Sequence, residues 1–171
     1  GNQSYSCNLD AKDCAETEYN EEPLRATGND CFGSPSRNDW YDTVKLNYGI
    51  DYRTGNRCFS PVPNTWVKML KILQYWASQG IDGFRCDMVE MTPVEFWAWA
   101  VPKIKEQFPG IIFIGEIYQP HIYRLFIKQG CFDYLYDKVG LYDTLRGVIN
   151  GQTSANDISY TLQSTADIRH N

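Results

Sequence analysis

The spacing of apolar and polar residues divides the chain into two parts. Residues 1–63 are rich in Asn, Asp, Gly, Pro and Ser and show no sustained period of 2 or 3.6 residues. This composition predicts loops and turns, with one stretch, 40–49, that alternates enough for a short strand before a Gly turn. From residue 64 to 171, helical periodicity alternates with short apolar runs, which is typical of an α/β domain.

Helical periodicity in the second part predicts five helices, bounded by capping residues, Gly or Pro, over about residues 64–80, 92–107, 121–129, 141–149 and 155–162. The first places Trp66 and Trp76 on one apolar face. The second is expected to begin with a capping box in which Thr92 and Glu95 satisfy each other's backbone. Ser154 is the expected N-cap of the last.

Three short apolar runs between these helices predict strands, at residues 80–87, 111–116 and 132–136. Strands separated by helices lie parallel, and the ligand site of a parallel sheet gathers at the carboxyl ends of its strands. The first two runs end on Asp87 and Glu116, and a carboxylate is costly at the edge of a packed core. These two acids are therefore candidates for chemistry.

The neighbours of the two acids suggest different roles for them. Side chains alternate along a strand, so Arg85 shares a face with Asp87 and favours its ionised form, suited to a base or nucleophile. Glu116 has no basic residue within its own strand, and an enclosed position near Asp87 would favour its protonated form. A nucleophile with a proton donor is what a retaining glycosidase needs. The alternative is a pair of solvated strand-end acids, neutralised by Arg85 and Lys138.

Two motifs carry a resemblance to a known family. Gly83-Phe84-Arg85-Cys86-Asp87, followed by Pro93, resembles the nucleophile segment of the alpha-amylase family, glycoside hydrolase family 13, and Ile114-Gly115-Glu116 resembles its acid/base segment. The two acids are 29 residues apart, about one βα unit. The resemblance implies a partial (β/α)8 TIM-type barrel, with strands about four to six and their helices in residues 64–171. Residues 1–63 would be the loop-rich end of the insertion between strand three and helix three.

The resemblance also implies an activity. The chain would belong to a retaining glycoside hydrolase or transglycosylase acting on α-linked glucosides such as starch or maltooligosaccharides. Asp87 would be the nucleophile, Glu116 the general acid/base and Arg85 the residue that orients Asp87. Tyr118 and Gln119, which follow the acid, would contact the sugar, with turn formation as the alternative for Gln119. No cofactor is required for this chemistry, and structural calcium is implied for the intact enzyme.

The chain departs from the family pattern in two places. Many members carry a Lys-His pair shortly after the nucleophile, where this chain has Glu90-Met91. The family's His-Asp pair, which carries a third catalytic carboxylate, is missing, and 171 residues are fewer than the about 250 of a closed barrel. We therefore interpret the chain as the middle of a catalytic domain that is inactive alone. The alternatives are a catalytically silent amylase-like binding or ectodomain module and an unrelated parallel α/β domain.

Composition and charge argue against some classes of binding partner. The net charge is −5 with scattered basic residues, which argues against nucleic acid or an anionic membrane surface as a partner. No apolar run approaches the roughly 18 residues of a membrane span. Aromatic residues make up 15% of the chain. Trp40 and Tyr48 suit either a sugar platform or local packing.

The cysteines and acidic residues give no metal motif. The six Cys contain no C-x-x-C and the two His are far apart, so we expect no zinc site. Cys86 and Cys131 are expected to be buried thiols. In a secreted or periplasmic protein, disulfides are an alternative to free thiols for two pairs, Cys7 with Cys14 and Cys31 with Cys58. Asp10, Asp13 and Glu16 miss the EF-hand spacing, which favours a solvated loop over a calcium site.

Overall fold

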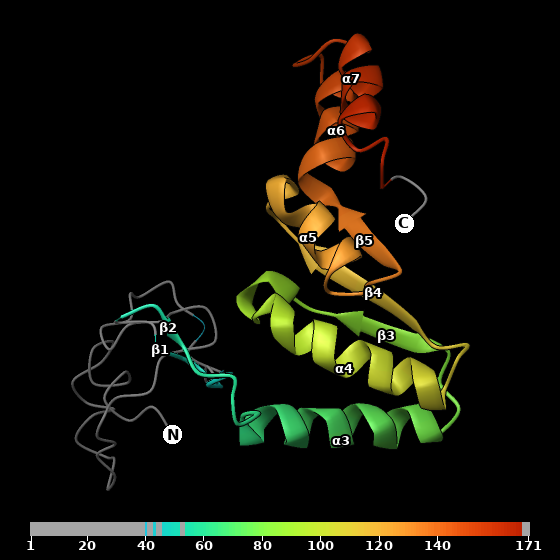
Figure 1. The fold of residues 1–171 in the computed structure, drawn as a ribbon. Helices are drawn as coiled ribbons and strands as arrows, with labels where there is room; N and C mark the ends of the chain where they lie inside the picture. The colour runs from blue at the N-terminus through green and yellow to red at the C-terminus, as the bar shows by residue number, and fades with distance from the viewer. Residues whose placement is uncertain (1–39, 41–42, 44–45, 52–53, 169–171) are drawn as a thin grey trace, which may run out of the picture. The chain divides into compact units, whose positions relative to one another are not determined.

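The computed structural model describes residues 40, 43, 46–51 and 54–168. The chain divides into two compact units, Gly1–Thr65 and Trp66–Asn171, each of which is described by itself. Figure 1 shows the described elements in chain order. Among the described residues, no helix is long and apolar enough to cross a membrane.

In the part of the first unit that the structure describes, two short strands form a small hairpin. Strand β1 (Ile50–Asp51) pairs antiparallel with β2 (Asn56–Arg57). The strand expected over 40–49 is wrong for the described residues of that stretch, none of which is in a strand. The Asn47 side chain accepts a hydrogen bond from the Gly49 N–H at 2.7 Å, and such local side-chain bonding competes with a strand ladder.

The second unit alternates helices with parallel strands, as the sequence predicts. Its elements in chain order are α3 (Asn64–Ser78), β3 (Gly83–Cys86), the 3-10 turn η1 (Val89–Met91), α4 (Val94–Gln107), β4 (Ile112–Ile117), the 3-10 turn η2 (Pro120–Ile122), α5 (Tyr123–Lys128), β5 (Tyr134–Asp137), the π-helical turn η3 (Lys138–Tyr142), α6 (Asp143–Ile149) and α7 (Asn156–Ser164). The three strands form one sheet in the order β3-β4-β5, with both pairs parallel. This is the arrangement of a partial (β/α)8 barrel.

The register of the sheet brings the ends of β3 and β4 together. Gly83 pairs with Ile112, and Cys86 pairs with Gly115. A Cβ at Gly83 would collide with the Ile112 carbonyl oxygen, so only glycine allows the strands to approach so closely there. The residues that follow these two pairs along the strands, Asp87 and Glu116, therefore lie at one edge.

The core lies on the helix-covered face of the sheet. Phe113 in β4 is fully buried, with ring centroids 5.2 Å from Phe84 and 6.3 Å from Phe132. Helix α4 joins this cluster through Trp97, 5.0 Å from Phe132, and α3 and α4 run side by side (Figure 1). Burying these large aromatic side chains stabilises the unit through the apolar area removed from water. Residues on the other face, including Tyr136, are more exposed and are available for binding.

Two details of the helices differ from expectation. The capping box at Thr92 is wrong, because Thr92 closes η1 by donating its N–H to the Val89 carbonyl at 3.1 Å, and Pro93 becomes the N-cap of α4. Trp76 is 51% exposed although it was expected on the buried face of α3. Each residue turns the helix by about 100° about its axis. Ala77, eleven residues after Trp66, therefore points within about 20° of the direction of Trp66, whereas Trp76, ten residues after it, points about 80° away.

The later elements shift by a few residues. The helix expected over 121–129 is divided into η2 and α5, and the strand expected over 132–136 becomes β5. The helix expected over 141–149 is preceded by η3, so its α-helical part begins at Asp143. Before α7, the Ser154 hydroxyl accepts from the Asn156 N–H at 3.2 Å, and the Ser154 N–H donates to the Asp157 carboxylate at 3.1 Å.

Candidate active site

One guanidinium contacts both candidate carboxylates at the carboxyl edge of the sheet. Arg85 in β3 forms a hydrogen-bonded ion pair with Asp87 through Nη1, and its Nη2 lies 3.0 Å from Oε1 of Glu116 in β4. Asp87 is 67% exposed, whereas Glu116 is only 15% exposed. Although Glu116 has no basic residue in its own strand, the neighbouring strand supplies one.

Glu116 also receives two hydrogen bonds from nearby loops. The Tyr118 hydroxyl donates to Oε1 at 3.3 Å, and the backbone N–H of Met88 donates to Oε2 at 3.3 Å. Met88 has φ 42° and ψ 50°, a left-handed conformation that is uncommon outside glycine. Such strained backbone is typical of functional sites, and here it accompanies an N–H directed at the carboxylate.

Glu90 connects the two loops that follow β3 and β4. Its Oε2 accepts a hydrogen bond from the Tyr118 N–H at 3.1 Å. With the Met88 bond to Glu116, this makes two links from η1 to the end of β4. Many members of the family that the chain resembles carry a basic residue at the position of Glu90. In this chain Glu90 instead binds the loop that carries Tyr118.

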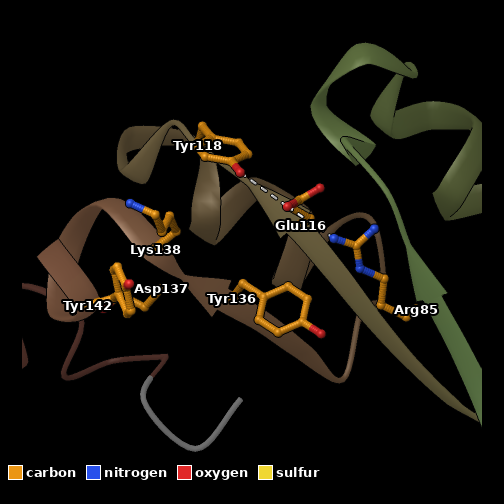
Figure 2. Close-up of a pocket in the computed structure, with 7 residues that line it drawn as sticks. All are labelled: Arg85, Glu116, Tyr118, Tyr136, Asp137, Lys138 and Tyr142. Atoms are coloured by element: carbon orange, nitrogen blue, oxygen red, sulfur yellow. Dashed lines mark hydrogen bonds and ion pairs between the residues drawn. The ribbon is translucent and has the colours of Figure 1, made fainter.

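A cavity of about 290 Å³ opens beside Glu116. Its lining comes from all three strands and the turn after β5 (Figure 2), and consists of Arg85, Glu116, Tyr118, Tyr136, Asp137, Lys138 and Tyr142. Arg85 Cζ lies 5.6 Å from the ring centroid of Tyr136. The hydrogen bond to Asp87 is the largest cause that raises the pKa of Arg85 above its usual range, and a hydrogen bond to Tyr136 adds to it. The charge of Glu116 is the main cause of a raised pKa at Tyr118.

The wall formed by η3 is held by specific contacts. Asp137 Oδ1 accepts from the Gly140 N–H at 3.0 Å and from the hydroxyl of buried Tyr123 at 3.3 Å. A Cβ on Gly140 would collide with the Asp137 carboxylate, so a larger residue at this position would displace that carboxylate. Lys138 Nζ lies 2.5 Å from Asp143 Oδ1 and 4.7 Å from the ring centroid of Tyr142.

The structure brings most of the predicted site residues together. Arg85, Glu116 and Tyr118 line the cavity, and Asp87 is joined to them through Arg85. Gln119 is not among the lining residues, and its carbonyl accepts the Ile122 N–H at 3.1 Å, which is the turn-forming alternative.

Sequence reasoning missed the part of the site contributed by β5 and η3. The alternative of solvated acids predicted that Lys138 helps to neutralise Asp87 and Glu116. In the structure, Lys138 instead pairs with Asp143. Tyr136, Asp137 and Lys138 stand at the carboxyl end of the third strand. The rule that selected the other two strand ends applies to this one as well, and would have found them.

The thiols and acidic residues of the described part offer no metal centre. Cys58, Cys86 and Cys131 are free thiols, and burial raises the pKa of Cys86 to about 12. Cys86 and Cys131 are only partly buried. Among the described residues, no group of three or more His, Cys, Asp or Glu side chains could hold an ion, so no step is assigned to one. The remaining cysteines and the acidic loop at 10–16 lie outside the described residues.

The chain is similar to known proteins over part of its length. No protein-family model matches the chain. An alpha-1,4-glucan:maltose-1-phosphate maltosyltransferase from Rhodospirillum rubrum is 33% identical over 66 residues, 38% of this chain and 10% of that protein. The chain thus spans about a tenth of the length of this curated relative.

Two solved structures share the fold. An alpha-amylase from Lactobacillus plantarum superposes with a TM-score of 0.58 at 22% identity, over 79% of this chain and 31% of the amylase. A maltogenic alpha-amylase from Thermotoga neapolitana superposes with a TM-score of 0.54 at 27% identity, over 79% of this chain and 27% of that one. These similarities show that the chain has the fold of part of an alpha-amylase barrel, and its two motifs at the ends of adjacent parallel strands resemble those of the alpha-amylase family, glycoside hydrolase family 13.

Proposed function

We propose that the protein containing this chain is a retaining glycosidase or transglycosylase that acts on α-linked glucosides. The observation that carries this proposal is the contact of the Arg85 guanidinium with both Asp87 and Glu116. Two carboxylates held on one guanidinium are close neighbours, and retaining glycosidases need a separation of about 5 Å between their carboxyl groups. Inverting enzymes need a wider gap that admits a water molecule.

Each residue has a defined role in the proposed reaction. The Asp87 carboxylate attacks the anomeric carbon and forms a glycosyl-enzyme ester, while Glu116 donates its proton to the departing glycosidic oxygen. Glu116 then removes a proton from water or from a sugar hydroxyl, which attacks the anomeric carbon and releases Asp87. Arg85 holds the Asp87 carboxylate in place for the attack through their ion pair. Tyr118, and in the full site Gln119, are proposed to contact the sugar.

The names of the relatives support α-glucans as the substrate class. They include a maltosyltransferase and alpha-amylases, so both transfer and hydrolysis occur among proteins similar to this chain. The two outcomes differ only in the acceptor that reaches the glycosyl-enzyme. We assign the chain to the chemistry that they share, the formation of a glucosyl ester on Asp87.

Trapping the glycosyl-enzyme tests the proposal. Incubating the intact protein with a fluorinated α-glucosyl fluoride, which forms the ester quickly and releases it slowly, should add one glucosyl group to the peptide containing Asp87, as read by mass spectrometry. Asp87→Asn should abolish the labelling, whereas Asp82→Asn, a nearby exposed acid, should retain it. NMR of the first product should show the α-anomer, because two displacements retain configuration.

The result that contradicts the proposal is equally clear. An intact, folded protein that binds maltooligosaccharides but takes up no label at Asp87 would be a catalytically silent binding module. Label at another carboxylate would show that Asp87 is not the nucleophile. Glu116→Gln should still be labelled, because fluoride leaves without a proton donor, but it should turn over unactivated glucosides roughly a hundredfold or more slowly.

A further inference from the structure

Both cations that line the cavity are already paired with carboxylates. Arg85 contacts Asp87 and Glu116, and Lys138 lies 2.5 Å from Asp143. Among the seven lining residues, Arg85 and Lys138 are the positively charged ones. An anionic ligand entering this cavity therefore meets no unpaired positive charge among its lining residues.

Lys138 is held in this paired state by the turn that carries it. It is the first residue of η3, whose geometry is fixed by the Asp137 carboxylate on the Gly140 N–H. The Lys138 ammonium also lies 4.7 Å from the ring centroid of Tyr142, a cation–π distance. Asp143 is the first residue of the following helix, so the backbone places it next to this ammonium.

The pKa of the Tyr118 hydroxyl shows which sign of charge its surroundings in the cavity favour. Its pKa is raised chiefly by the charge of Glu116, and the opposing effects of Lys138 and Arg85 are smaller. A raised pKa at a phenol means that the surroundings disfavour a negative charge at that point. A phosphate group beside Tyr118 would meet the same unfavourable surroundings while Glu116 is ionised.

We propose that Asp143 is a specificity-determining residue that closes this cavity to sugar phosphates by neutralising Lys138, so that the site takes uncharged glucosyl units. The inference rests on the proposed function and goes further, because it names the residue that excludes one class of α-glucosyl donor. A binding site can reject a wrong ligand by removing that ligand's charge from water without offering it an unpaired opposite charge. The chain would then differ from the relatives whose name specifies maltose-1-phosphate.

Removing the charge of Asp143 is the direct test. In the intact protein, kcat/KM is measured for maltose 1-phosphate and for maltoheptaose, and the ratio of the two is compared between variants so that intrinsic reactivity cancels. Asp143→Asn should raise the ratio in favour of the phosphate by about tenfold, because one nearby unit charge is freed. The gain should shrink with added salt, because the freed charge is partly exposed.

Matched variants separate this effect from damage to the fold. Asp167→Asn removes a carboxylate of nearly the same exposure, 43% against 44%, from an ion pair with Arg124 outside the cavity, and should leave the ratio unchanged. Asp143→Ser also removes the charge and suits a helix start, so it should repeat the gain. Combining Asp143→Asn with Lys138→Met should abolish it.

Two results would overturn the inference. One is a wild-type protein that uses maltose 1-phosphate as efficiently as maltoheptaose, and the other is an unchanged ratio in both folded Asp143 variants. If neither substrate is turned over, the proposed function fails and calorimetric binding decides the inference separately. Weaker binding of maltose 1-phosphate than of maltotriose, restored by Asp143→Asn, then supports the inference, and equal binding overturns it.

Discussion

Substituting Gly115 tests whether packing requires a glycine next to Glu116. Gly115 is buried on the helix side of β4, and a Cβ added there would lie 2.9 Å from Leu135 Cδ2 and 3.1 Å from two Phe132 ring atoms. The first contact is about 0.5 Å shorter than an ordinary contact, which begins at 3.4 Å. Gly115→Ala would create this overlap, and the neighbouring side chains would have to move to relieve it. We expect this overpacking to lower the free energy of unfolding by about 1 to 3 kcal/mol.

The displacement should also reach the chemistry. Glu116 is the next residue, and because a 1 Å misplacement costs about a hundredfold in rate, a shift of half that size should lower kcat about tenfold. Thermal unfolding followed by tryptophan fluorescence should show a midpoint roughly 2 to 12 °C lower.

A second glycine gives the control for this substitution. Gly110 precedes β4, and a Cβ added there would meet nothing within 4 Å. Gly110→Ala should therefore change stability by less than about 0.5 kcal/mol and leave kcat unaffected. A Gly115→Ala protein with wild-type midpoint and kcat would refute the packing argument.

Three further predictions concern the core and the thiols. Phe113→Ala should destabilise the protein by about 3 to 5 kcal/mol in a urea titration, because it empties a fully buried ring site. Asp133→Asn should cost about 1 to 2 kcal/mol in the same titration, since Asp133 accepts the Phe113 N–H at 2.8 Å and pairs with Lys105 at 2.5 Å. Because burial raises the pKa of Cys86 to about 12, its thiol stays neutral at pH 8, and iodoacetamide followed by peptide mass spectrometry should modify exposed Cys58 well before Cys86.

The order of elements and the position of the two acids could be predicted because they depend on local pattern. Helical periodicity and short apolar runs identified α3, α4 and the three strands, and parallel pairing follows from the alternation. Asp87 and Glu116 could be placed at one edge, because the carboxyl ends of parallel strands meet there.

The contacts made across the sheet could not be predicted from the same pattern. That Arg85 reaches Glu116 depends on the register of β3 against β4, in which Arg85 lies opposite Ile114. Register is set by packing of whole strands, so one strand's sequence leaves the partner of Arg85 undefined. The basic residues within a single strand therefore do not reveal this contact.

Turns that depend on one side chain were also missed. The start of α4 moved because Thr92 was used by η1, and propensity alone cannot show which of two neighbouring turns takes a residue. The wall at η3 depends on the Asp137 carboxylate finding the Gly140 N–H, and π-helical turns are too rare for a pattern to identify.

The two hydrogen bonds from η1 to the end of β4 bear on protein engineering. Met88 and Glu90 belong to the connection after β3. Their partners are Glu116 in β4 and Tyr118 directly after β4. Grafting one of these loops alone from a homologous barrel would break both hydrogen bonds unless the new loop supplied matching groups. In this chain the two would have to be exchanged as a pair, since a transplanted β3 loop without matching groups would leave Glu116 without the hydrogen bond from the Met88 N–H.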